Sequence, residues 1–524
     1  MQMRRILALL LGMCLLLCGC TETPDAYVPT GNGLSYDSDY TGPQNTLPPE
    51  EKAQTLSLVY YKEENFNPYS SGDFTNRALF SLLYQGLFTV DRDYVTEPML
   101  CKSFTMTKDM KTYTFYLEKA TFSDGSLLTA EDVVASLTAA RGNRYYAGRF
   151  THIKEIKKST DGGVTVQLDT PYENLPILLD IPIVKAAYVG ADRPLGTGPY
   201  VIYSAAGGES LHRRTNWWCR PDMAVTAETI TLFPAESNTQ IRDQFEFFDL
   251  SLVCADPGSD RYVDYRCDYE LWDCENGIFL YLSTTANSEV FSIDSVRTAL
   301  TYAIDRDTLV ANYYRGFARS VTLPASPQSP YYNIALAERY KYNKERFAEA
   351  VRNAGMVDAK VVFLVNSDDS LRLRLARDIK KMLEDCGLVV EMSLLGGHEY
   401  VDALKTWKFD IHLGQTRLSP NMDLSPFFDT YGELSWGGVN DVVAYSLCLQ
   451  ALENHGNYYT LYDTVMKNGL LCPILVRSYA VYATRGLLTE LTPARDNVFY
   501  YSLGKSTEAI KTVVENVPVP EPTE

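Results

Sequence analysis

The sequence predicts an α/β fold, because strand-like and helix-like segments alternate along the chain. The clearest signal is a β-α-β unit with a strand over 360–366, a helix over 370–386 and a strand over 388–394. Its connections are short, and parallel pairing is the usual outcome for strands joined in this way. With 524 residues, of which 46% are hydrophobic and 22% charged, the chain has the composition of a globular protein of about three domains.

Upstream of that unit, strands and helices are mixed in the same way. Thr129 is the expected N-cap of a helix that carries Glu131 and Asp132 in its first turn. The expected elements, in order, are a strand over 54–61, a helix over 76–88, a strand over 113–117, the helix from Thr129, a strand pair over 156–168, a strand over 278–284, a helix over 295–314 with one apolar face, a helix over 343–353 closed by Gly355, and a strand over 409–414.

The first 19 residues have the pattern of an export signal. Arg4 and Arg5 precede an apolar run over 6–17 that is too short to span a hydrocarbon core of about 30 Å. The run ends in Leu-Cys-Gly-Cys, which resembles the lipobox of bacterial lipoproteins and makes Cys20 the expected lipidation site. An ordinary secretory signal with incidental cysteines is the alternative.

Beyond the signal the chain is acidic. The full chain has a formal charge of −18, which repels phosphate backbones, so we expect no nucleic-acid partner and no membrane contact except through the lipid. Residues 20–53, rich in Pro, Gly, Ser and Thr, are expected to form a flexible tether, and 511–524 a disordered tail. The expected location is extracytoplasmic, anchored to the cell membrane by the N-terminal lipid.

Few residue patterns indicate covalent or metal chemistry. Eight of the 11 cysteines lie after Cys20 and permit disulfides, but the sequence fixes no pairing. There is no CxxC pair and no HxxxH spacing among the five histidines, so no metal and no other cofactor is expected. GxSxG and HExxH are also absent, and the chain is not expected to be an enzyme.

Five motifs indicate a family. They are NPYSSGDFTNRALFSLLYQGLFTVDRDYVTEPMLCKSF from Asn67, FSDGSLLTAEDVVASL from Phe122, GTGPYVI from Gly196, VRTALTYAIDRDTLVANYYRGFA from Val296 and NKERFAEAVRNAGM from Asn343. In this order they resemble the extracellular solute-binding proteins of family 5, the peptide-, nickel- and oligosaccharide-binding components of ABC transporters. Each motif is interpreted as framework. Gly196 and Gly198, for example, suit a close chain reversal.

The resemblance implies a periplasmic-binding-protein-like type II fold, with two lobes in three domains. Hinge crossings are expected near 275–285 and 470–482. The implied parts are a signal peptide over 1–19, the tether over 20–53, a discontinuous lobe I over 54–75, 190–277 and 475–510, an inserted domain over 76–189, lobe II over 278–474 and the tail over 511–524.

The resemblance also implies a function. A lipid-anchored monomer would capture an oligopeptide or another polar solute by hinge closure and deliver it to the permease and ATPase subunits of an ABC importer. Two alternatives are a surface ligand sensor of the same fold and an exported hydrolase. Isothermal titration or thermal-shift screening against peptides, sugars, amino acids and metals tests for solute binding and identifies its class. Turnover abolished by Asp423→Asn would indicate the hydrolase, and growth or uptake assays of a deletion strain separate the importer component from the sensor.

Candidate ligand contacts follow the strand over 409–414. In family peptide binders an aspartate here pairs with the amino terminus of the peptide, but the matching place is Pro420, or Asn421 if the register shifts by one. Asp423 could substitute if the loop is reshaped, or it could cap the helix that follows. Arg417 suits a ligand carboxylate or phosphate, and a structural salt bridge is its alternative.

Aromatic and amide side chains supply the other candidates. Trp436, followed by two glycines, is interpreted as a stacking wall for the ligand, with a core position as the alternative. Tyr61, Asn67 and Tyr69 lie where the first strand is expected to enter the cleft. The 37 tyrosines suit a polar ligand in a half-wet site, although most of them must be scaffold.

Overall fold

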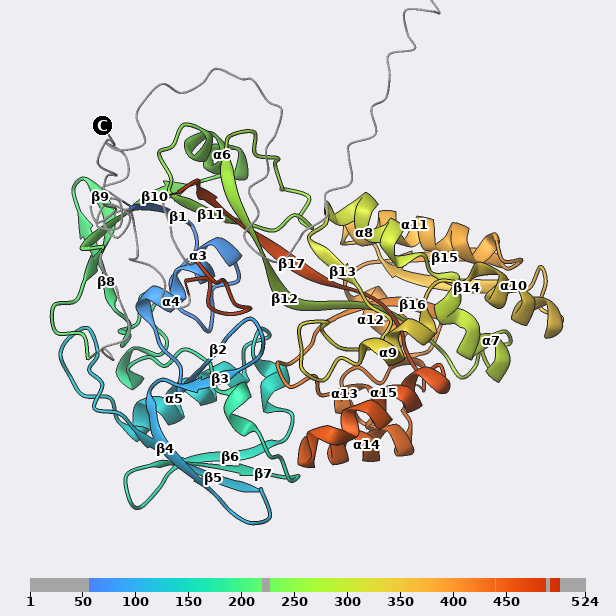
Figure 1. The fold of residues 1–524 in the computed structure, drawn as a ribbon, viewed down its shortest axis with the longest axis horizontal. Coiled ribbons are helices and arrows are strands. Elements are labelled where there is room, and N and C mark those ends of the chain that lie inside the picture. The colour runs from blue at the N-terminus through green and yellow to red at the C-terminus, as the bar shows by residue number, and fades with distance from the viewer. Residues whose placement is uncertain (1–55, 219–226, 439, 487–490, 500–524) are drawn as a thin grey trace, which may run out of the picture.

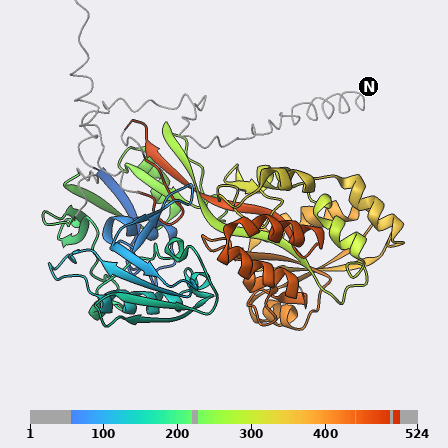
Figure 2. The same cartoon turned by 60° about the horizontal axis from the view of Figure 1, so that its bottom comes forward.

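The protein has two lobes joined by two long strands. The computed structural model describes residues 56–218, 227–438, 440–486 and 491–499. Strands β12 (Tyr269–Thr284) and β17 (Cys472–Thr484) run from one lobe to the other (Figure 1). We call the lobe with β1 to β11 lobe I and the lobe with α7 to α15 lobe II; Figure 2 shows them as separate blue-to-green and yellow-to-red halves. The expected signal, Cys20, tether and tail lie outside the described residues.

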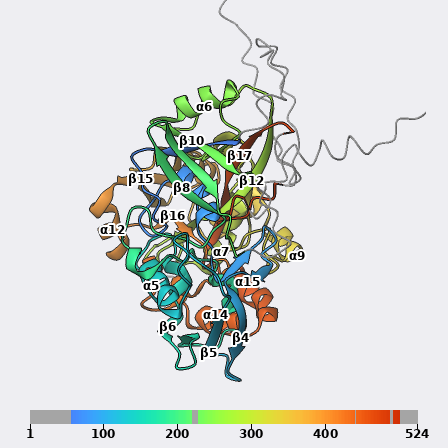
Figure 3. The same cartoon turned by 90° about the vertical axis from the view of Figure 1, so that its left-hand side faces the viewer.

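Lobe I contains two four-stranded sheets, one above the other in Figure 3. The upper sheet has the order β1-β10-β9-β8 and the lower sheet β4-β5-β7-β6. The elements of lobe I are β1 (Leu56–Tyr61), α3 (Phe74–Ala78), α4 (Phe80–Leu83), β2 (Phe88–Val90), β3 (Thr96–Pro98), β4 (Cys101–Met106), β5 (Thr112–Leu117), α5 (Ala130–Arg141), β6 (Ile153–Lys158), β7 (Val164–Leu168), β8 (Tyr200–Ala205), β9 (Gly208–Arg213), β10 (Thr229–Ala235), α6 (Asn238–Glu246) and β11 (Leu252–Ala255).

One sheet, with the order β11-β17-β12-β16-β14-β15 and β13 paired to β17, extends through both lobes. Strands β12 and β17 pair along most of their length, so the connection between the lobes is itself part of this hydrogen-bonded sheet. The elements of lobe II are α7 (Asp294–Ala299), α8 (Arg306–Tyr314), β13 (Ala318–Ser320), α9 (Ile334–Ala337), α10 (Lys344–Asn353), β14 (Lys360–Asn366), α11 (Ser370–Glu384), β15 (Val389–Leu395), α12 (Gly397–Lys405), β16 (Ile411–Arg417), α13 (Ser425–Phe428), α14 (Val442–Glu453) and α15 (Tyr458–Lys467).

Most of the predicted elements are confirmed where local signals were strong. Strands β14 and β15 are parallel and flank α11, as the β-α-β pattern predicts. Thr129 caps α5 in a reciprocal arrangement with Asp132. Gly355 and Gly387 follow α10 and α11 with φ of 71° and 101°, a conformation that glycine adopts at little cost.

Two segments are predicted as continuous helices, and both predictions are wrong. The segment 76–88 forms two short helices that meet at Leu79, and it is extended from Tyr84 onward. The segment 295–314 is interrupted at Ile304, and the Asp305 side chain accepts the Thr308 N–H and starts α8 anew. A local side-chain cap therefore competes with helix continuation. The buried Arg306 guanidinium donates to the Thr301 and Ile304 carbonyls at the break and to the Pro473 carbonyl of β17.

A bulge interrupts β12 where it passes between the lobes. The register with β17 shifts between Glu275 and Phe279, and Gly277 has φ of 70°. The Gly277 carbonyl accepts the Leu418 N–H of lobe II at 3.0 Å. A Cβ at this position would lie 2.5 Å from the guanidinium carbon of Arg495.

We expect Gly277→Ala to destabilise the protein by about 2 kcal/mol, because left-handed strain and displacement of Arg495 add together. The matched control is Gly486→Ala, since Gly486 has φ of 72° but no atom of the described residues within 4 Å of its Cβ position. That control carries only the strain and should lose about 1 kcal/mol. Urea unfolding measures both variants, and equal losses would show that Arg495 is not displaced.

Candidate functional site

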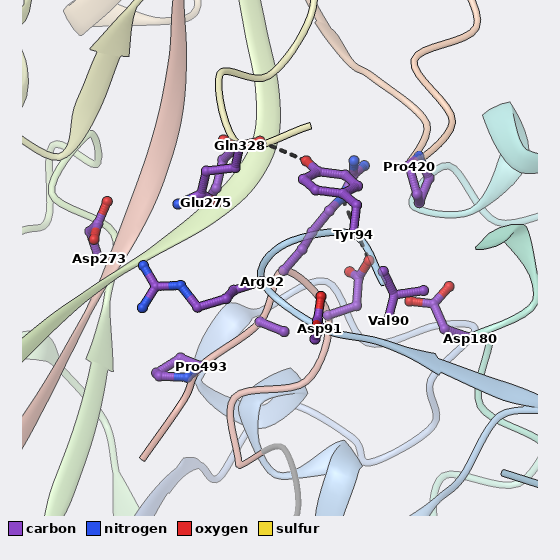
Figure 4. Close-up of a pocket in the computed structure, with 13 residues that line it drawn as sticks. Val90, Asp91, Arg92, Tyr94, Asp180, Asp273, Glu275, Gln328, Pro420 and Pro493 are labelled. Atoms are coloured by element: carbon purple, nitrogen blue, oxygen red, sulfur yellow. Dashed lines mark hydrogen bonds and ion pairs between the residues drawn. The ribbon is translucent and has the colours of Figure 1, made fainter. Parts of the chain in front are cut away.

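A pocket lies between the lobes and has walls from each of them (Figure 4). The cavity has a volume of about 10 Å³, which is room for about one water molecule. The lobes are therefore almost closed on each other. The lining residues are Val90, Asp91, Arg92, Tyr94 and Asp180 of lobe I, Asp273 and Glu275 of β12, Gln328 and Pro420 of lobe II, and Pro493, Ala494, Arg495 and Asp496 of the segment after β17.

The pocket wall carries charges of both signs. Glu275 is buried and accepts hydrogen bonds from the Tyr94 hydroxyl at 2.9 Å and from Ser326 Oγ at 2.5 Å. Burial raises the pKa of Glu275 above its ordinary value. The Asp273 carboxylate pairs with Arg319 at 2.6 Å. Such a wall can bind hydrogen-bonding and ionic groups of a polar molecule.

Next to this pocket, three arginines surround the carboxylate of Asp496. Arg149 Nη2 lies 2.5 Å from Oδ2, Arg417 Nη2 lies 2.8 Å from Oδ1, and Arg495 Nε lies 3.6 Å from Oδ2. The Tyr145 hydroxyl also donates to Oδ1 at 2.6 Å. Burial alone would raise the pKa of Asp496, but the arginines outweigh burial and hold that pKa well below its usual range. This cluster joins lobe I to lobe II, because Arg417 ends β16.

A second charged contact between the lobes is centred on His152. Its Nε2 lies 3.2 Å from Asp423 Oδ2 in lobe II, and its Nδ1 lies 3.1 Å from Asp169 Oδ1 in lobe I. Burial alone would lower the pKa of His152, but the two carboxylates outweigh it and raise the pKa to about 10. At neutral pH the ring is therefore an imidazolium that connects the lobes.

The same ring lies 2.9 Å from Ser425 Oγ, which gives Asp169, His152 and Ser425 the order of a hydrolase triad. A triad requires a neutral imidazole that can accept the serine proton. Here the ring is protonated, and Ser425 Oγ donates instead to Asp423 Oδ2 at 2.8 Å. The arrangement suits a stable contact rather than nucleophilic catalysis.

Closure of the lobes should depend on pH through His152. When the lobes separate, His152 loses Asp423 and keeps Asp169, so its pKa falls from about 10 in the closed form toward the ordinary 6.5. Protonation therefore favours closure fully below about pH 6.5, and this contribution is lost as the pH rises toward 10. Small-angle scattering at pH 6 and at pH 10, close to these two pKa values, should show that the lobes open at the higher pH. His152→Gln should remove the pH dependence; if opening persists unchanged, His152 is not its source.

The structure brings Arg417, Asn421 and Asp423 to the lobe interface. Arg417 stacks on Tyr145, with its guanidinium carbon 3.7 Å from the ring centroid, and pairs with Asp496. Asp423 accepts the Ser425 N–H at 2.9 Å, although the N-cap residue of α13 is Leu424. Asn421 is buried, lines a second cavity beside Asp423 and accepts the Tyr458 hydroxyl through its backbone carbonyl. Their roles as ligand contacts stay predictions.

The other four candidates lie in neither of these cavities and have partners within the described chain. Asn67 is buried and donates to the Val189 and Ala191 carbonyls. The remaining contacts are Tyr69 to the Pro182 carbonyl, Tyr61 to Asn238, and Trp436 against the apolar cluster of Leu364, Tyr400, Ala403, Leu404 and Phe409. Ligand contact by these four also stays a prediction.

Sequence reasoning did not find Arg149, His152 or Asp496. His152 and Asp496 lie more than 70 residues from the candidates that they contact, Asp423 and Arg417, and Arg149 contacts Asp496. No local pattern marks any of the three. Asp496 follows Arg495 in a short polar turn that has the composition of an ordinary loop.

Three further observations concern only the described ranges. No group of three His, Cys, Asp or Glu side chains there is placed to hold a metal ion. Every helix in those ranges is too short or too polar to cross a membrane. The seven cysteines from Cys101 to Cys472 that are described are all free thiols, and Cys219 lies outside the described residues.

Comparisons with known proteins agree with this architecture. The family model described as "Bacterial extracellular solute-binding proteins, family 5 Middle" matches residues 95–438. The glutathione-binding protein GsiB of Escherichia coli (strain K12) is 26% identical over 308 residues, which are 55% of this chain and 59% of the relative. This chain therefore matches about three fifths of the length of that curated relative.

Solved structures share the fold at low identity. HbpA2 from Haemophilus parasuis superposes with a TM-score of 0.70 at 15% identity, over 86% of this chain and 99% of that one. The oligopeptide-binding protein AppA from Bacillus subtilis, solved with a nonapeptide, gives 0.61 at 18% identity, over 86% and 98%. The predicted type II binding-protein fold is confirmed.

Proposed function

This chain belongs to the bacterial extracellular solute-binding proteins of family 5, and from that premise we propose that it is the lipid-anchored substrate-binding subunit of an ABC importer. It captures an oligopeptide or another polar solute by closure of its lobes and delivers it to the permease. The chemistry is binding without a covalent step.

One observation carries the proposal: the pocket is built from both lobes at once. Tyr94 of lobe I, Glu275 of β12 and Gln328 of lobe II line the same cavity (Figure 4). That cavity now admits about one water, so a larger solute enters while the lobes are apart and contacts both of them only when they close around it. It therefore stabilises the closed form by its differential affinity for the two states.

The charges of the pocket support a polar, ionic solute. Carboxylates on the wall suit an amino group, and guanidinium groups suit a carboxylate. Asp91 is one such carboxylate, although its Oδ1 already accepts the Asp93 and Val95 N–H groups at 2.8 Å. A small peptide carries both kinds of group, and the name of the relative GsiB states a peptide of this kind, glutathione.

The remaining parts of the proposal concern attachment and organisation. Cys20 carries the lipid, residues 20–53 tether the folded body outside the membrane, and the protein acts as a monomer. The inserted domain comprises 76–189 and lobe II comprises 278–474. The connecting strands β12 and β17 support hinge crossings near 275–285 and 470–482.

Isothermal titration of the protein from residue 54 onward against di- to pentapeptides, glutathione, sugars and amino acids tests the proposal. We expect at least one peptide or polar solute to bind, and scattering to show a more compact particle in its presence. Binding by none of these classes, or binding without compaction, would contradict capture by closure.

A further inference from the structure

The carboxylate of Asp496 occupies a site that has more donors than one carboxylate can use. Arg149 and Arg417 each reach it through a single Nη2 atom, and Arg495 only through Nε at 3.6 Å. The Nε of Arg417 and the Nε and Nη1 of Arg495 are buried without a hydrogen-bond partner among the described residues. A guanidinium frequently binds a carboxylate through two parallel N–H groups. None of these three arginines binds Asp496 in that way.

The charges at this site are also unequal. Among the described residues, the ion pairs of the three arginines involve only Asp496 and Asp180, and Asp180 contacts Arg149 alone. The side chains of Arg149 and Arg495 are 3% and 10% exposed. Buried cations that lack full pairing are costly, so the site favours an anionic occupant that pairs with the guanidinium groups more fully than Asp496 does.

Asp496 lies at the tip of a short turn, so its side chain can leave the arginines without movement of the rest of lobe I. Ala494 and Asn497 pair through two backbone hydrogen bonds of 3.0 and 3.2 Å and close the turn. On either side, Leu491 and Phe499 are buried in the core of lobe I. The turn therefore reaches from an anchored base toward Arg417. Because Arg495 shares its tip with Asp496, only the Asp496 side chain must rotate away to vacate the three guanidinium groups.

We propose that Arg149, Arg417 and Arg495 form a carboxylate-binding subsite for the solute, and that Asp496 occupies it as an internal stand-in when the lobes close without solute. The inference deepens the proposed function, on which it rests, by naming the solute class as carboxylate-bearing. A solute carboxylate replaces Asp496 and keeps the charge balance. Its other groups contact the walls of the adjoining pocket, which Arg495 and Asp496 also line. Because that pocket now admits about one water, the lobes close less far on the solute than they do here, and the added contacts let it outcompete the tethered aspartate.

Chemical rescue tests the subsite without knowledge of the solute. Asp496→Ala should lower the melting temperature, and about 0.1 M sodium acetate should raise it again by about 2 °C more than the same concentration of acetamide with matched sodium chloride. Wild-type protein should show no such difference, because its own aspartate fills the site. The double variant Asp496→Ala/Arg417→Ala should not be rescued.

Asp256→Ala is the matched control. Asp256 also pairs with a buried arginine, accepting Arg477 Nη2 with both oxygens at 2.6 and 2.9 Å, but one guanidinium binds it instead of three. It should show no rescue by acetate. Equal effects of acetate and acetamide on Asp496→Ala, or equal rescue of Asp256→Ala, would overturn the inference. If Asp496→Ala does not fold, Asp496→Asn keeps the side-chain shape and is measured in the same way.

Titration of glutathione and its diethyl ester into Asp496→Asn then separates the two proposals. Tighter binding of the acid than in wild type, by about tenfold, with the ester unchanged, supports the subsite. Failure of the rescue overturns the subsite and leaves capture by closure intact. A successful rescue in a protein that binds no peptide, sugar or amino acid overturns the proposed function and leaves the anion site in place.

Discussion

Replacing Asp423 by alanine is expected to weaken solute binding by about a hundredfold. The carboxylate of Asp423 lies 3.2 Å from the His152 imidazolium across the lobe interface and also accepts the Ser425 N–H and hydroxyl. Removal of one partner of a buried ion pair costs about 3 kcal/mol, which corresponds to about two decades in an equilibrium constant. Because the pair joins the lobes, its removal destabilises the closed form relative to the open form.

Two measurements distinguish this effect from direct contact with the solute. Scattering from the empty Asp423→Ala protein should show a larger radius of gyration than that of wild type. Isothermal titration should show the same fold-loss for every solute that closes the lobes. If Asp423 instead binds an amino group, the loss will be confined to solutes that carry one, and the empty protein will be unchanged.

Asp169→Ala is the matched control, because Asp169 contacts the other nitrogen of the same ring. It lies in the same lobe as His152, and its side chain is 57% exposed. Exposed pairs contribute less than about 1 kcal/mol, so its affinity should fall by only a few-fold. Equal losses for the two variants would mean that His152 acts within lobe I and does not connect the lobes.

Local signals explain which parts of the fold the sequence predicts. The β-α-β unit and its flanking helix carry N-caps, apolar periodicity and terminal glycines within a few residues of each other. Strand β12 was predicted only from residue 278, but it starts at Tyr269. Its first half contains Asp273 and Glu275, whose side chains line the pocket and remove the apolar pattern expected of a buried strand.

The site could be predicted only in part, for a similar reason. Arg417 and Asp423 are found because they follow a strand end, where side chains meet the interface. Their partners Asp496 and His152 come from distant segments, and only the tertiary fold brings them together. The sequence shows the residue types at these positions, but it does not show which charged side chains lie in contact.

The GTGPY motif allows a second prediction with a large effect. We expect Gly198→Ala to lower the free energy of unfolding by at least about 3 kcal/mol. A Cβ on Gly198 would lie 2.5 Å from the Leu83 carbonyl carbon and 2.6 Å from the Leu82 oxygen. These are backbone atoms that no rotamer change can move, and the Gly198 N–H donates to the Leu83 carbonyl at 3.0 Å.

Gly190→Ala separates this steric effect from the general cost of replacing a glycine. Gly190 is exposed, and nothing lies within 4 Å of its Cβ position. Its replacement should change the free energy of unfolding by less than about 0.5 kcal/mol. Calorimetry and limited proteolysis of both variants decide the question. A loss confined to Gly198→Ala means that the motif needs a glycine for the close approach of two backbones, the contact that fixes β8 against α4, whereas a loss below about 1 kcal/mol would show that the end of α4 can shift to admit a methyl group.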